Sequence, residues 1–92
     1  MNIFWTVFAQ DDLNAIFDYI VVEDQDAAIR LVRNIRTKVD ALTEYPYMGK
    51  IGRVSGTREL LVDRKYYIIY RVIDDNIHIL NIIHNSRKYP PE

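Results

Sequence analysis

The sequence predicts one α+β domain, in which a helical hairpin packs on a twisted antiparallel sheet in the order β-α-α-β-β-β. Strand-like runs rich in β-branched and aromatic residues stand almost end to end between residues 56 and 90. Two segments with helical periodicity precede them, and a short alternating run opens the chain. A chain of 92 residues is long enough for one domain, so the prediction treats residues 1–92 as a single unit.

The first two elements are predicted from a change of period. Asn2–Val7 alternates as a short strand does, with Ile3, Trp5 and Val7 on one side. Apolar residues then recur at i, i+3, i+4 and i+7, namely Leu13, Ile16, Phe17 and Ile20, which predicts a helix over about Ala9–Val22. We expect Asp11 and Asp12 in its first turn, where carboxylates complement the helix dipole.

A polar break and a second apolar stripe predict the other half of the hairpin. Asp24 and Asp26 are both suitable N-caps for a helix over about Asp26–Glu44. Its stripe comprises Ala28, Leu31, Val32, Ile35, Val39 and Leu42. Pro46 disfavours helical angles before it, so a loop is expected up to Gly52. We expect everything before Gly56 to cover one face of the sheet.

The last part of the chain predicts an antiparallel meander. Its strands are Thr57–Val62, Tyr66–Ile73 and Ile77–His84, separated by short polar turns. The second turn contains Asp74 and Asp75, which tolerate tight-turn backbone angles. The predicted core combines alternate strand residues with helix residues, namely Leu13, Ile16, Ile20, Leu31, Ile35 and Val39. By alternation, His78 is expected on the same face as Leu80, Ile82 and His84.

Composition and charge limit the class of protein. About half of the residues are hydrophobic and 27% are charged, which is typical of a soluble globular domain. No apolar run reaches ~18 residues, no signal peptide is evident, and there is no cysteine, so we expect a cytoplasmic protein. Residues 1–45 carry four Lys/Arg against eight Asp/Glu, and residues 46–92 carry eight against five. The basic half suggests an acidic or polyanionic partner, although a mixed solvated surface explains it equally well.

The candidate site residues are basic and lie around the predicted sheet. His84 and Arg87 follow the last strand, where a histidine can act as acid or base, although a surface histidine bonded to a turn is also consistent. Arg58 suits bidentate binding of a phosphate or carboxylate, or pairing with a neighbour on the sheet. The predicted partner-binding residues are Arg53, Arg58, Arg64, Lys65, Arg71, Arg87 and Lys88. Two histidines without patterned carboxylates predict no metal site, and no cofactor motif is present.

The whole chain resembles the RelE/ParE superfamily of bacterial type II toxins. The resemblance rests on the element order, on Trp5, on the spacing from Ala9 to Ile16 and on the motif Tyr45–Lys50. The strongest pieces are Gly56–Leu60, Tyr66–Val72 and Ile83–Pro90. No single motif is decisive, but their order and spacing together are specific.

This resemblance implies a cognate antitoxin, complexes of toxin with antitoxin, and one of two targets. It also implies that the seven basic partner-binding residues named above are target- or antitoxin-binding residues. ParE-like members poison DNA gyrase and are not known to do chemistry of their own, whereas RelE-like members cut mRNA on the ribosome without a metal. The longer hairpin and the loop with Pro46 and Gly49 favour the ParE-like interpretation. A non-toxic protein-interaction domain on the same scaffold is the third interpretation, so whether the chain is an enzyme stays open.

The ribonuclease pattern fits only in part. It needs two basic residues on the strand before Tyr66–Val72, and the chain supplies Arg58 but has Leu60 at the second position. It needs an arginine where Tyr67 stands, while Arg87 fits the arginine after the last strand. If the chain is RelE-like, the resemblance implies His84, Arg58 and Arg87 as the catalytic residues, with His84 as acid or base and the arginines on the phosphate.

Overall fold

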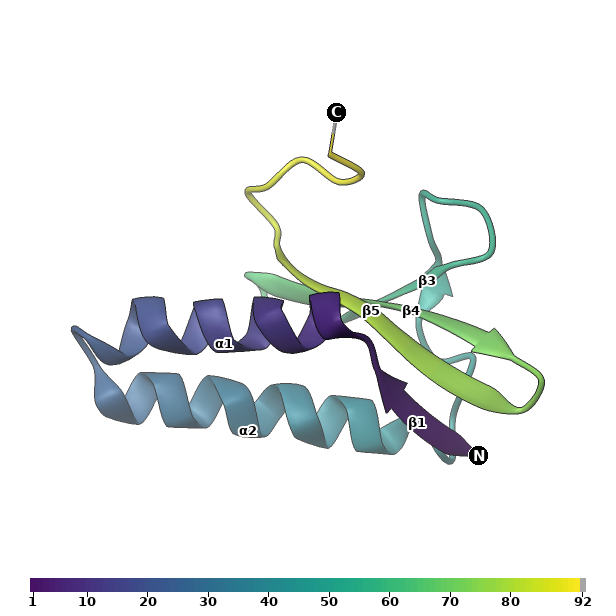
Figure 1. The fold of residues 1–92 in the computed structure, drawn as a ribbon, viewed down its shortest axis with the longest axis horizontal. Helices are drawn as coiled ribbons and strands as arrows, with labels where there is room; N and C mark the ends of the chain where they lie inside the picture. Colours follow the sequence, from purple (N-terminus) through teal and green to yellow (C-terminus); the bar gives the residue numbers. More distant parts are fainter. Residues whose placement is uncertain (92) are drawn as a thin grey trace.

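The structure is a computed structural model that describes residues 1–91. Five strands form one sheet in the order β1-β5-β4-β3-β2. The strands are β1 (Asn2–Trp5), β2 (Lys50–Ile51), β3 (Arg58–Leu61), β4 (Tyr66–Ile73) and β5 (Asn76–His84), and the helices are α1 (Val7–Val21) and α2 (Gln25–Ala41). The helical hairpin lies along one side of the sheet, and the tail after β5 rises on the other side (Figure 1). The predicted α+β fold is therefore confirmed.

The meander is antiparallel as predicted, but the sheet as a whole is mixed. β3 pairs with β4 and β4 with β5 in antiparallel register. β1 instead pairs parallel with β5, from Asn2 opposite Asn76 to Trp5 opposite Ile79. β2, which the sequence predicted as loop, adds an edge strand through Lys50 opposite Glu59. The expectation that everything before Gly56 covers the sheet was therefore wrong for these two strands.

α1 begins two residues earlier than predicted because Thr6 caps it. The Thr6 hydroxyl accepts a hydrogen bond from the Ala9 N–H at 3.1 Å and donates to the Ile79 carbonyl at 2.8 Å. This cap ends β1 at Trp5 and starts the helix, which places Asp11 and Asp12 beyond the first turn. Their predicted dipole role was therefore wrong. α2 is capped by Asp24, one of the two predicted residues.

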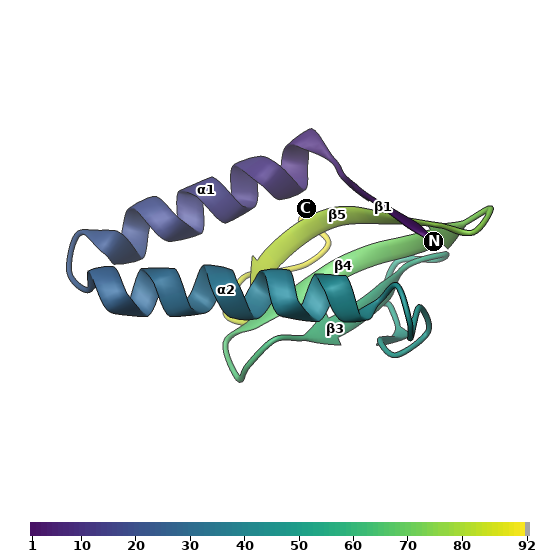
Figure 2. The same ribbon diagram turned by 90° about the horizontal axis from the view of Figure 1, so that it is seen from below.

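The core lies between the hairpin and the helix-facing side of the sheet. α1 and α2 run side by side across that face (Figure 2). Leu13, Leu31, Ile35 and Val39 are buried in it, while Ile16 and Ile20 are partly buried against it. The strands contribute Leu60, Ile68, Tyr70, Ile77, Ile79 and Ile82. The predicted core is thus confirmed, with α2 at its centre.

A register shift in β5 changes which residues share a face. Ile69 pairs with Asn81 but Tyr70 pairs with Ile79, so Leu80 is an extra residue on β5. Consequently Ile82 lies opposite Ile68 in the core, while His78 lies opposite Arg71 on the other face, where it stacks on Phe4 at 5.5 Å. The prediction that His78 and His84 share a face was wrong, because strict alternation does not continue through a bulge.

Candidate functional site

His84 and Arg87 lie in one cavity, as their closeness in sequence suggested. The cavity, of about 570 Å³, lies between α1 and the end of β5 and is lined by Asp12, Ala15, Ile16, Tyr19, Tyr66, Ile82, Ile83, His84, Ser86 and Arg87. The ring of His84 meets the ring of Tyr66 edge-on, with centroids 4.9 Å apart. Arg58, the third candidate for catalysis, does not line this cavity.

The hydrogen bonds of His84 fix its tautomer. Its Nδ1 accepts a hydrogen bond from the backbone N–H of Ser86 at 3.0 Å and lies 2.6 Å from the Ser86 hydroxyl. Because a backbone N–H can only donate, Nδ1 must be unprotonated, and the neutral ring carries its proton on Nε2. In this arrangement Nε2 is a hydrogen-bond donor. His84 would have to break the bond to Ser86 before Nε2 could act as a general base.

Arg58 and Tyr70 hold the loop that precedes β2. Nη1 of Arg58 donates to the carbonyl oxygens of Gly49 at 2.8 Å and Tyr47 at 3.3 Å, and its guanidinium lies 5.0 Å from the centre of the Tyr47 ring. The Tyr70 hydroxyl donates to the Pro46 carbonyl and accepts from the Gly49 N–H, at 2.8 and 2.9 Å. Burial raises the pKa of Tyr70, although the bond from Gly49 acts in the opposite direction. Arg58 is therefore engaged within the fold.

The sheet register separates Arg58 from His84. Arg58 lies opposite Tyr70 on β4, and His84 lies opposite Tyr66 on the same strand. Two strand spacings across the sheet and four residues along β4 put their Cα atoms about 16 Å apart. The structure thus brings His84 and Arg87 together but leaves Arg58 on another part of the molecule.

The other predicted cations are spread around the sheet. Arg64 and Lys65 are exposed in the β3–β4 turn, whose backbone carbonyl groups accept hydrogen bonds from Asn85. Arg71 lies near the C-terminal end of β4, where its guanidinium lies beside Gly56. Gly56 has a φ of 81°, a backbone conformation that favours glycine. Arg87 and Lys88 follow β5 and are exposed.

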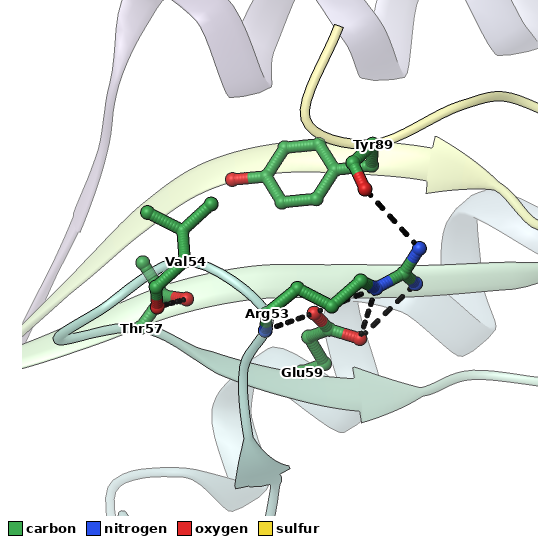
Figure 3. Close-up of polar contacts among 5 residues, drawn as sticks. All are labelled: Arg53, Val54, Thr57, Glu59 and Tyr89. Carbon is green, nitrogen blue, oxygen red and sulfur yellow. Dashed lines mark hydrogen bonds and ion pairs between the residues drawn. The ribbon is translucent and has the colours of Figure 1, made fainter.

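Arg53, one of the predicted binding residues, forms hydrogen bonds to both Glu59 and Tyr89 (Figure 3). Its backbone N–H donates to Glu59 at 2.9 Å, and its Nε lies 3.2 Å from the same carboxylate oxygen. Nη1 donates to the carbonyl of Tyr89 at 3.3 Å, so Arg53 joins the tail to the sheet. The guanidinium also lies over the rings of Tyr67 and Tyr89, at 5.0 and 5.9 Å.

The charges of this pair stabilise each other. Burial alone would raise the pKa of Glu59, but the hydrogen bonds and charge of Arg53 outweigh it and hold that pKa below its ordinary value. The pKa of Arg53 is raised, first by its hydrogen bonds to Glu59 and last by the Tyr67 phenol. Sequence reasoning considered pairs within the sheet but missed the tail. Glu59 was the residue from which the contact could have been predicted, because a carboxylate within a strand of the sheet needs a cation as its partner.

No described His, Asp or Glu side chains gather in the number that a metal site requires. Neither of the two described helices combines the length and apolar content needed to cross a membrane.

The comparisons with known proteins show a small toxin of the RelE/ParE superfamily. The sequence model described as "ParE toxin of type II toxin-antitoxin system, parDE" matches residues 3–89. The chain therefore belongs to the ParE family of type II toxins.

Individual relatives agree on the superfamily but carry names from both branches. The chain is 46% identical to the Sinorhizobium fredii protein "Putative toxin Y4kP", over 94% of this chain and 90% of that protein. It is 40% identical to "Toxin RelE2" of Caulobacter vibrioides, over 94% of this chain and 97% of that protein. Among solved structures, "Chromosomal ParDE TA system from P. aeruginosa" superposes with a TM-score of 0.81 at 32% identity, covering 91% of this chain and 95% of that one.

Proposed function

We propose that this toxin inhibits bacterial growth by acting on DNA gyrase in the cytoplasm, and that a cognate antitoxin neutralises it. The observation that carries the choice of target is the burial of Leu60 and Tyr67, which are 7% and 6% exposed. These two residues stand where the ribonuclease pattern needs cations on the RNA phosphates. Leu60 belongs to the hydrophobic core, so at this position of the ribonuclease pattern the chain has no charged side chain that could reach an RNA phosphate.

Two further contacts favour a toxin that binds rather than cleaves. Arg58 donates its hydrogen bonds to the loop before β2, so it would have to leave Gly49 to reach a phosphate. Nδ1 of His84 accepts the hydrogen bond of the Ser86 N–H, so this nitrogen is not free to take a proton from a 2′-hydroxyl. Cleavage of RNA without a metal needs a base, an acid and cations in one place.

The RelE-like ribonuclease remains the alternative, and two observations favour it. His84 and Arg87 share a cavity beside Tyr66, and a relative of 40% identity carries the name RelE2. In that alternative the chain is an enzyme that needs no metal, and ribosome-bound mRNA replaces gyrase as its target. An interaction domain without toxicity is the remaining possibility.

An antitoxin partner is supported by the ParDE neighbour, whose title names a toxin-antitoxin system. The outer side of α1 offers a surface for such a partner. Phe8, Tyr19 and Val22 lie there at helical spacing and are 72%, 84% and 84% exposed, although all three are large and apolar. The His84 cavity adjoins this side through Ala15 and Tyr19. We therefore place an antitoxin helix along α1, with an acidic segment of the antitoxin reaching the basic residues of the sheet.

Growth and supercoiling assays together test the proposal. Expression of the chain alone should arrest growth, and coexpression with the small protein encoded beside it should restore growth. Purified toxin should inhibit supercoiling by gyrase and stabilise its cleavage complex with DNA, and added antitoxin should prevent both. Growth that continues normally without antitoxin would leave the non-toxic interaction domain. Growth arrest with unaffected gyrase would refute this choice of target.

A further inference from the structure

A second cavity, on the face of the sheet opposite the helices, contains a buried polar group without a partner. Its volume is about 490 Å³, and its lining comprises Met48, Gly49, Lys50, Arg53, Glu59, Leu60, Leu61, Tyr67 and Asn85. The phenol oxygen of Tyr67 is buried and has no hydrogen-bond partner within residues 1–91. Arg53 lies over the ring and its charge interacts with the phenol, but none of its N–H groups meets hydrogen-bond geometry with this oxygen. A buried hydroxyl without a partner is costly, so this one is a candidate donor to a bound group.

The charges around this cavity leave one cation available. Glu59 is occupied by Arg53, as described above. Lys50 lies opposite Glu59 in the β2–β3 register and its charge helps to lower the pKa of Glu59, but it forms no ion pair or hydrogen bond with any described residue. Lys50, Arg53 and Glu59 therefore give the cavity a net charge of +1. The remaining walls are largely apolar, through Met48, Leu60 and Leu61.

We infer that this cavity binds a carboxylate carried on an apolar body, with Lys50 and the Tyr67 hydroxyl donating to its two oxygens. A single negative charge matches the single available cation, and a carboxylate accepts hydrogen bonds at both oxygens. A phosphate dianion would bring a second negative charge close to the buried carboxylate of Glu59. The carboxylate can belong to a small organic acid or to an aspartate or glutamate side chain of a peptide, and the ligand chemistry is the same.

Nuclear magnetic resonance titration of the full chain tests the inference with four probes. They are hexanoate, hexanamide, a blocked peptide Leu-Glu-Leu and inorganic phosphate. We expect saturable shifts of the amides of Gly49, Lys50, Leu61 and Tyr67 with hexanoate or the Glu peptide, and none with hexanamide. The stronger of these two acids identifies the source of the carboxylate. Absence of saturation with both acids, or equal binding of phosphate or hexanamide, would overturn the inference.

Two variants separate binding from folding. Tyr67→Phe removes a hydroxyl that has no geometric hydrogen-bond partner among residues 1–91, so the thermal midpoint should change little, while affinity for the acid should drop about tenfold or more. Lys50→Gln should weaken binding to a similar extent. The exposed Lys65 of the β3–β4 turn provides the matched control, since Lys65→Gln should leave binding unchanged. Unchanged affinity in both Tyr67→Phe and Lys50→Gln would refute the assignment of the donors.

Discussion

Asp12 on α1 accepts a hydrogen bond from the backbone N–H of Ile82 on β5 at 3.0 Å. The same carboxylate oxygen accepts from the side-chain amide of Asn81, also at 3.0 Å. β1 covers the edge of β5 only as far as Ile79, so the following residues have no strand on that side. Asp12 therefore satisfies a backbone group that the short parallel strand leaves open.

Asp12→Ala should destabilise the protein by about 2 kcal/mol, because the Ile82 N–H loses its partner beside the core. Urea denaturation measures this loss, and amide hydrogen exchange at Ile82 should accelerate more than exchange at Ile68. Asp11 is exposed on the neighbouring position of the helix, so Asp11→Ala is the matched control and should change stability little. Equal stability of the Asp12 and Asp11 variants would show that solvent replaces the carboxylate without cost.

The sequence was most informative where structure is local and periodic. Asp24 and the stripe from Leu31 to Val39 determine α2. The predicted tight turn at Asp74 and Asp75 is present, with φ values of 49° and 63°. β1 was recognised as a strand, but its parallel pairing with β5 joins residues more than seventy positions apart, and no local pattern encodes it. β2 has two residues, which is too few to show a period.

The candidate site was less predictable, because its contacts depend on segments distant in sequence. Arg53 was predicted as a binding residue, yet its partners Glu59, Tyr67 and Tyr89 come from two strands and the tail. The bulge at Leu80 places His78 on the opposite face of the sheet. No glycine stands at or beside Leu80, so the sequence has no sign of this bulge. The basic residues were found by composition, but only the sheet register separates Arg58 from His84.

Ile35→Ala should cost about 2–5 kcal/mol, because a completely buried side chain is replaced by a cavity. Leu31→Ala should fall in the same range, since that side chain is 7% exposed. Ile29 lies on the same helix and is 39% exposed, so Ile29→Ala provides a control with a much smaller loss. Chemical denaturation checks the three values. Losses below about 0.5 kcal/mol at both buried positions would contradict the place of α2 in the core.

Removal of Arg53 should lower stability more at pH 7 than removal of the charge on Glu59. Arg53→Gln leaves a buried carboxylate with only the backbone N–H as partner, whereas Glu59→Gln releases an arginine that is half exposed to water. The thermal midpoints of the two variants show which substitution lowers stability more. A larger loss in Glu59→Gln would mean that the carboxylate does not depend on the guanidinium.

The same pair predicts a pH dependence with a definite sign. The pKa of Glu59 is lowered in the folded protein, so its contribution to stability is complete above its ordinary value of 4.5 and is lost as the pH falls through the folded pKa. In Arg53→Gln, burial should instead raise that pKa. The difference in stability between wild type and variant should therefore shrink on acidification below about pH 5. A difference in stability that stays constant with pH would show that it does not come from the ionised Glu59 carboxylate.

Tyr19→Ala should weaken antitoxin binding by about 2 kcal/mol, if the exposed side of α1 is the docking surface proposed above. Tyr19 is 84% exposed, so the fold should retain its stability. Isothermal titration calorimetry with the purified antitoxin measures the change, and circular dichroism controls for folding. Tyr45 is another large exposed aromatic, 62% exposed and outside the hairpin face, so Tyr45→Ala should bind as wild type does. Equal affinity of all three proteins would exclude this face of α1.

Cleavage of mRNA by this toxin on translating ribosomes should be weak or absent. Loss of one positioned acid or base typically costs about 10²–10⁴-fold, and here Leu60 and Tyr67 replace two cations while His84 Nδ1 is bonded to Ser86. Primer extension on a purified translation system measures the cuts, with a catalytically active RelE-like toxin as positive control. The decisive comparison is His84→Ala. Codon-dependent cleavage by the wild type that disappears in this variant, with antitoxin binding intact, would assign catalysis to His84 and refute the ParE-like proposal. Arg87→Gln should then also reduce cleavage, because Arg87 lines the same cavity as His84 and a ribonuclease needs a cation on the reacting phosphate.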